Sequence, residues 1–133
     1  MPSLTLGLLT RAATKPHFLM TVQQTLSDLV AIDSVSARSN AELVAYLQTR
    51  CAALGLRIKS YPHTDDNGIE KINLVARTSD IAAVELALVG HTDTVPYDPN
   101  WNEALRLTEQ DDKLFGRGSC DTKAIYRGGA HRN

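Results

Sequence analysis

Apolar side chains recur at helical spacing in two stretches of the N-terminal half. Spacing of three and four residues gathers side chains on one face of a helix. Ser39-Asn-Ala-Glu42 has the pattern of a capping box, and Gly55 suits the position just after a helix. The sequence therefore predicts two amphipathic helices, one over residues 20–32 and one from Ser39 to Leu54. Their apolar positions are Val22, Leu26, Leu29, Val30 and Ile32, then Leu43, Val44, Leu47, Cys51 and Leu54.

The pattern changes to that of β-strands after Gly55. Residues 56–61 alternate apolar and polar side chains, residues 62–68 are polar as in a turn, and residues 72–76 are again apolar. Residues 84–89, Val-Glu-Leu-Ala-Leu-Val, are apolar enough for a central strand that is buried on both faces. These segments predict three strands, of which the third is the most buried.

A further pair of short strands is predicted near the C-terminal end. Residues 105–108 and 113–115 flank a polar turn at Gln110-Asp-Asp112, which indicates a hairpin. Helices precede and interleave with strands, so the predicted fold class is α/β.

A histidine and an aspartate lie two positions apart where the apolar run 84–89 ends. Positions i and i+2 of a strand point the same way, so His91 and Asp93 can lie side by side. A metal-bound histidine usually donates its second ring N–H to an oxygen acceptor, often a carboxylate, which fixes its tautomer. His91-Thr-Asp93 is therefore a candidate ligand with its orienting carboxylate.

The composition of the chain indicates which kinds of molecule and which cellular compartment to expect for it. The chain has 133 residues, 43% of them hydrophobic and 22% charged, with a net charge of −1. This balance gives no support for nucleic acid or an anionic membrane as a partner, and no apolar run is long enough to span a bilayer. Two cysteines without a metal or disulfide pattern favour reduced thiols in the cytoplasm. Residues 1–19 lack the order of a secretory signal, so we expect a loosely ordered N-terminal extension.

A second candidate motif follows His91 by about thirty residues. Gly116-Arg-Gly118 permits a tight turn, and Asp121 follows in the same loop. A carboxylate has two oxygens and can bridge two cations, and paired metals are a common device for hydrolysing stable bonds. Histidine nitrogen and aspartate oxygen both suit Zn²⁺, and partly Co²⁺.

Together the two motifs resemble the N-terminal signatures of a co-catalytic zinc metallopeptidase and deacylase family. Its members include acetylornithine deacetylase, succinyl-diaminopimelate desuccinylase, aminoacylase and glutamate carboxypeptidase. The resemblance rests on residues 90–96, Gly-His-Thr-Asp-Thr-Val-Pro, on residues 113–118, Lys-Leu-Phe-Gly-Arg-Gly, and on residues 121–123, Asp-Thr-Lys. The run Thr94-Val-Pro-Tyr-Asp98, with Trp101 close behind, resembles acetylornithine deacetylases more than the other members.

The resemblance implies specific roles. His91 would bind one metal, Asp121 would bridge two zinc ions, and Asp93 would be the catalytic-site carboxylate that holds the His91 ring. The peptide after Asp121 would be cis. The implied reaction is hydrolysis of N2-acetyl-L-ornithine to acetate and L-ornithine in arginine biosynthesis. A desuccinylase or dipeptidase of the same family is the alternative, and full-length relatives are expected to be homodimers that act on small N-acyl amino acids.

The chain also departs from the family pattern. The Glu-Glu pair that provides the general base and a further ligand does not follow Asp121, and residues 124–133 read as an aberrant tail after a frameshift or truncation. Residues 20–123 then correspond to the N-terminal portion of a catalytic domain with a mixed sheet flanked by helices. We expect this chain alone to be inactive, and a non-catalytic α/β fragment is the rival hypothesis from another class.

Several residues allow simpler interpretations. His63-Thr-Asp65 repeats the triplet at His91, but no buried strand leads into it, so a solvated loop is expected. Asp121 could instead cap a helix that starts at Thr122. Cys120 is expected to pack as a small residue rather than to act as a thiolate.

Overall fold

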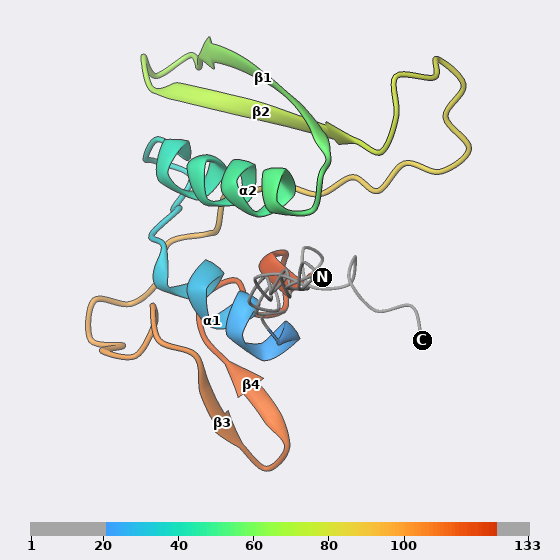
Figure 1. The fold of residues 1–133 in the computed structure, drawn as a ribbon. Coiled ribbons are helices and arrows are strands. Elements are labelled where there is room, and N and C mark those ends of the chain that lie inside the picture. The colour runs from blue at the N-terminus through green and yellow to red at the C-terminus, as the bar shows by residue number, and fades with distance from the viewer. Residues whose placement is uncertain (1–20, 125–133) are drawn as a thin grey trace, which may run out of the picture.

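The structure, a computed structural model, describes residues 21–124. Two helices, α1 (Val22–Ala31) and α2 (Ala41–Ala53), precede two antiparallel hairpins. The first hairpin joins β1 (Arg57–Thr64) to β2 (Glu70–Arg77), and the second joins β3 (Thr108–Gln110) to β4 (Lys113–Phe115). Figure 1 shows the first hairpin lying over α2 and the second extending away beside α1. The predicted α/β class is confirmed. The expected extension 1–19 and residues 125–133 of the expected tail lie outside the described residues.

Helix α1 forms where the apolar spacing predicts it. Thr21 is its N-cap, and the Thr21 hydroxyl accepts a hydrogen bond from the Gln24 N–H at 3.1 Å. The apolar face is buried through Leu26, Leu29 and Val30. Helix α1 ends at Ala31, and its C-cap residue Ile32 already has an extended backbone.

Helix α2 forms as predicted, but its predicted capping box does not. The N-cap is Asn40, not Ser39, and its side chain makes no hydrogen bond to the helix. The Asn40 amide instead pairs with the backbone of Ile72, accepting from its N–H at 2.8 Å and donating to its carbonyl at 3.0 Å. Asn40 also donates to the Thr92 hydroxyl at 2.8 Å. The side chain of Asn40, the N-cap residue, therefore makes tertiary hydrogen bonds and does not cap the helix. At the other end Gly55 has φ +73°, and its N–H donates to the Ala52 carbonyl, as predicted for the residue after a helix.

The core lies where α1, α2 and β2 meet. Leu29, Leu43 and Leu47 form the buried cluster, and Tyr46 and Leu74 pack against it. Burial and Asp28, which accepts from the Tyr46 hydroxyl at 3.1 Å, together raise the pKa of Tyr46 to about 12. The core is thus small and joins both helices to the first hairpin.

The first hairpin is longer than predicted. Strand β1 continues through Pro62 and His63 to Thr64, so the turn is confined to the residues that follow rather than covering 62–68. Asp65 makes this shorter turn, because its carboxylate accepts from the N–H groups of Asn67 and Ile69, each at 2.9 Å.

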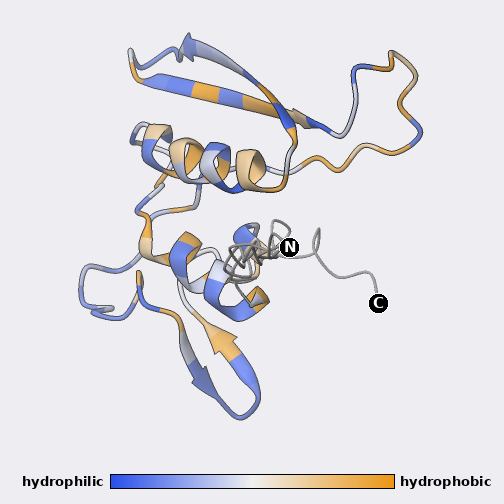
Figure 2. Ribbon diagram, viewed as in Figure 1, coloured by the Kyte–Doolittle hydropathy of each residue, from blue (hydrophilic) through white to orange (hydrophobic). Residues whose placement is uncertain are grey.

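The predicted central strand over residues 84–89 is wrong. These residues adopt no strand and pair with no neighbour, and Leu86, Leu88 and Val89 are 74%, 75% and 84% exposed. Figure 2 shows this loop, which follows β2, with much of it in the hydrophobic colour. An extended segment becomes a strand only when another strand satisfies its N–H and carbonyl groups. The described residues provide no such neighbour here, so the apolar pattern alone does not produce a strand.

The second hairpin is confirmed, but its first strand is β3 and not residues 105–108, so that Gln110 lies in the strand rather than in the turn. Its turn residues Asp111 and Asp112 both have positive φ, +51° and +58°, as a two-residue hairpin turn requires. The described strands form two separate antiparallel pairs. Neither described helix is long and apolar enough to cross a membrane.

Candidate metal centre

Two loops bring the predicted site residues together. The segment of His91 and Asp93 is held by a parallel bridge between Val35 and Thr94. The Thr94 N–H donates to the Ser34 carbonyl and the Ser36 N–H donates to the Thr94 carbonyl, both at 2.9 Å. These bonds fix the segment beside the chain that leaves α1. The third residue, Asp121, comes from the loop that follows β4.

His91 lies between the two aspartates. Its Nε2 is 3.1 Å from Asp121 Oδ1, although thirty residues separate them in the sequence. Its Nδ1 is 2.9 Å from the Asp93 carbonyl oxygen and 3.2 Å from Asp93 Oδ1. One ring nitrogen therefore faces the orienting residue and the other faces the carboxylate from the second motif. This is the arrangement that the two sequence motifs predict, reached without the strand that was expected to position His91.

The electrostatics follow from these contacts. Partial burial lowers the pKa of His91, but the hydrogen bonds to Asp121 and to the Asp93 backbone outweigh it, and the net effect raises the pKa above 6.5. Hydrogen bonds from Thr122 first and from His91 second hold the pKa of Asp121 below its usual range. Without a metal, these contacts favour a proton on His91 Nε2 that points to Asp121 Oδ1. These are the two atoms that could bind the same metal ion. The Asp121–Thr122 peptide is cis, as the resemblance implies.

His91 and Asp121 provide some, but not all, of the ligands that a zinc ion requires. Ligands about 2.1 Å from a tetrahedral ion lie about 3.4 Å apart, close to the 3.1 Å between His91 Nε2 and Asp121 Oδ1. Nitrogen and oxygen donors of this kind suit zinc. Within residues 21–124, however, no group of three His, Cys, Asp or Glu side chains is placed to hold a metal ion. His91 and Asp121 fit as part of a metal centre whose other ligands the described residues do not supply.

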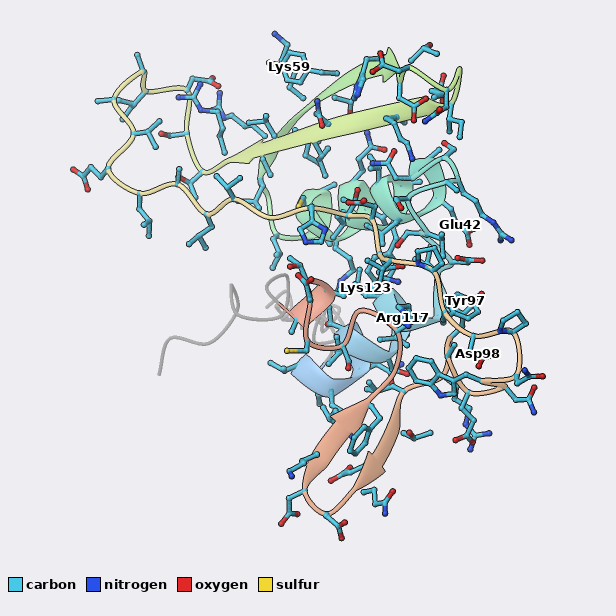
Figure 3. All side chains as sticks on the ribbon, turned by 180° about the vertical axis from the view of Figure 1, so that it is seen from behind. Glu42, Lys59, Tyr97, Asp98, Arg117 and Lys123 are labelled. Carbon is cyan, nitrogen blue, oxygen red and sulfur yellow. The ribbon has the colours of Figure 1, made fainter. Side chains whose placement is uncertain are left out.

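The loop that carries Asp121 is anchored by Lys123, which belongs to the Asp-Thr-Lys motif but had no predicted role. Lys123 is completely buried, and its ammonium donates to the Ile32 carbonyl at 2.7 Å, at the end of α1. Burial lowers the pKa of Lys123 to about 8, and Asp33 opposes this shift. Figure 3 shows Lys123 next to α1 in the middle of the molecule, whereas Lys59 extends from the outer hairpin. Its place in the Asp-Thr-Lys motif, two residues after Asp121, is the sequence signal that points to Lys123.

Other residues of this region occupy simpler environments. Cys120 is exposed, so the expectation that it packs as a small residue is wrong, because Lys123 and not Cys120 turns inward from this loop. The guanidinium of Arg117 lies 5.3 Å from the centre of the Trp101 ring, which makes that tryptophan part of the loop packing. His63 lies in strand β1 and is exposed, so the expected loop is wrong there but the expected exposure is right.

Gly118 allows the close packing of the Asp121 loop, and its replacement by alanine should be costly. Its φ is +79°, and an added Cβ would lie 2.8 Å from Thr94 Cγ2 and 3.0 Å from Lys123 Cδ. We expect Gly118→Ala to lower the free energy of unfolding by about 2–4 kcal/mol, from the left-handed backbone and overpacking together. Urea unfolding measures this loss.

Gly68 provides the matched control for Gly118. It has the same φ of +79°, but no atom lies within 4 Å of an added Cβ. Gly68→Ala should therefore cost only the backbone part, about 1 kcal/mol. Equal losses in the two variants would contradict the close packing of Gly118.

The comparisons with known proteins match the part of the chain that carries His91, Asp93 and Asp121. The chain is related by sequence to peptidase family M20/M25/M40, with residues 87–132 matching that family. Members of this family generally bind divalent metals.

Three individual relatives share a more specific name, acetylornithine deacetylase. The chain is 46% identical over 112 residues to the acetylornithine deacetylase of Myxococcus xanthus, an overlap of 83% of this chain and 30% of that relative. It is 38% identical over 106 residues to the acetylornithine deacetylase of Edwardsiella ictaluri, an overlap of 74% and 27%. It is 39% identical over 102 residues to that of Yersinia pseudotuberculosis, an overlap of 72% and 26%. The chain thus spans less than a third of the length of these curated relatives.

Proposed function

We propose that this chain provides the first metal ligands of an amide hydrolase of the acetylornithine deacetylase type. The observation that carries the proposal is the 3.1 Å approach of His91 Nε2 to Asp121 Oδ1 from two distant loops. Both residues lie in the part of the chain that matches the peptidase family. The reaction proposed is the hydrolysis of N2-acetyl-L-ornithine to acetate and L-ornithine.

His91, Asp93 and Asp121 would have different roles in metal binding. His91 would bind a metal ion through Nε2, which must first lose its proton, while Asp93 on the Nδ1 side keeps the ring in that orientation. Asp121 has a side chain that is 81% exposed, so its second oxygen remains accessible to a second cation. The metals, when bound, would supply Lewis acidity and a water of lowered pKa. We propose zinc, with cobalt as a substitute, because the donors are nitrogen and carboxylate oxygen.

The pathway, location and assembly are proposed from the relatives and from the sequence. We place the activity in arginine biosynthesis in the cytoplasm, with a small N-acyl amino acid as substrate. A homodimer is proposed for the full-length protein. The general base and the remaining ligands would come from another part of the full-length protein, since residues 122–133 contain no glutamate.

A chimera tests the proposed function directly. The 112 matching residues of the Myxococcus xanthus relative would be replaced by the corresponding residues of this chain. We expect the chimera to release ornithine from N2-acetyl-L-ornithine, to lose this activity with a chelator and to regain it with zinc. A chimera that folds as the parent relative does but shows no metal-dependent hydrolysis would sink the proposal.

A further inference from the structure

The largest completely buried side chain of the described residues is a lysine. Lys123 has no exposed surface, and Gly118 lies so close that an added Cβ would contact the lysine stem at 3.0 and 3.2 Å. Lysine is almost never fully buried unless its charge is paired. The hydrogen-bond partner of the Lys123 ammonium is the Ile32 carbonyl at 2.7 Å, and Ile32 is the C-cap of α1.

This burial is hard to explain by stability alone. Moving an ammonium out of water is costly, and an aliphatic side chain of similar length would fill the same space without that cost. Replacing buried charges with apolar residues of similar volume is often neutral or stabilising. What an aliphatic residue cannot do is hold the Asp121 loop to a fixed backbone oxygen at the end of α1.

Asp121 needs such an anchor because few contacts of its own hold it in place. Its side chain is 81% exposed, and its contacts are the hydroxyl of Thr122 and the ring of His91. Lys123 follows two residues later, and its N–H donates to the Gly118 carbonyl at 3.0 Å, closing the loop. The loop is thus closed on itself by the backbone of Lys123 and tied to α1 by its side chain.

We propose that Lys123 is a positioning residue, which sets Asp121 opposite His91 by tying the loop of residues 118–123 to the C-terminal end of α1. This inference rests on the proposed function, since it takes His91 and Asp121 as the ligand pair. Lys123 itself touches neither metal nor substrate. Its role is to fix the separation between two ligands that come from different loops.

The test compares Lys123→Met with a matched control in the metal-free 133-residue chain. Lys59 is the control, because its side chain extends from the outer hairpin, where its ammonium lies 5.0 Å from the centre of the Tyr61 ring. The readout is the nitrogen-15 chemical shift of His91 Nε2, with Asp121→Asn marking the value for a lost contact. Thermal unfolding is measured on the same samples.

In Lys123→Met the His91 Nε2 shift should move at least halfway to the Asp121→Asn value, with the melting temperature within a few degrees of the parent. In Lys59→Met the shift should stay at the parent value. A Lys123→Met chain that keeps the parent shift overturns the inference. A chain that fails to fold also overturns it, because Lys123 would then serve the fold and not the position of Asp121.

A zinc titration separates this inference from the proposed function. We expect Lys123→Met to bind zinc roughly tenfold more weakly than the parent, the lower range for loss of a residue that orients a ligand. If the parent shows no zinc binding that depends on His91 and Asp121, the assignment of the ligand pair fails. The His91 shift in the metal-free chain still decides whether Lys123 positions Asp121.

Discussion

In the chimera with the Myxococcus xanthus relative, Asp121→Asn is expected to lower kcat/KM by at least about 10³-fold, because charge stabilisation by a bound metal is worth several kcal/mol. Asparagine has nearly the same shape as aspartate, but it carries no negative charge and offers only one carbonyl oxygen. Asparagine therefore cannot offset the positive charge of the metal ions, and it cannot bridge two of them. Steady-state hydrolysis of N2-acetyl-L-ornithine with saturating zinc measures the effect.

The chain offers a matched control for this substitution in its repeated triplet. His63-Thr-Asp65 has the same residues as His91-Thr-Asp93, but His63 is exposed in strand β1. His63→Asn should leave kcat/KM within about twofold, whereas His91→Asn should be as harmful as Asp121→Asn. A large loss in His63→Asn, or a small one in Asp121→Asn, would show that the wrong residues have been assigned.

The second large effect is expected in the core. Leu43 is completely buried between α1 and the first hairpin, in contact with Leu29 and Leu47. Leu43→Ala should lower the free energy of unfolding by about 2–5 kcal/mol, from lost burial and the cavity left behind. A domain is typically stable by only about 5–15 kcal/mol, so this loss could remove much of the fold. Urea unfolding followed by circular dichroism measures it.

Leu86 distinguishes the observed fold from the one that the apolar pattern predicts. Leu86 is 74% exposed in the loop that was expected to be a central strand. Leu86→Ala should change the free energy of unfolding by no more than about 0.5 kcal/mol, as for other surface positions. If Leu86→Ala costs as much as Leu43→Ala, residues 84–89 are buried in the isolated chain and the observed exposure is wrong.

The helices and hairpins could be predicted because their causes are local. Leu26, Leu29 and Val30 lie on one helical face whatever surrounds them, and the Gly55 conformation follows from the end of a helix. The Ser39 capping box failed because α2 begins at Ala41, so that Asn40 and not Ser39 takes the N-cap position. Asn40 lies nearer the helix start, and its side chain bonds with the backbone of Ile72 instead.

The sequence by itself determined which side chains are candidate ligands, and it predicted that His91-Thr-Asp93 and Asp121 belong to one site. Side-chain chemistry and short-range spacing are properties of the chain alone. Only the tertiary structure decided that His91 Nε2 lies 3.1 Å from Asp121, that residues 84–89 have no strand neighbour, and that Lys123 is buried. Each of these depends on residues far apart in the sequence, because a strand needs a partner and a buried ammonium needs an acceptor, here the Ile32 carbonyl at the end of α1.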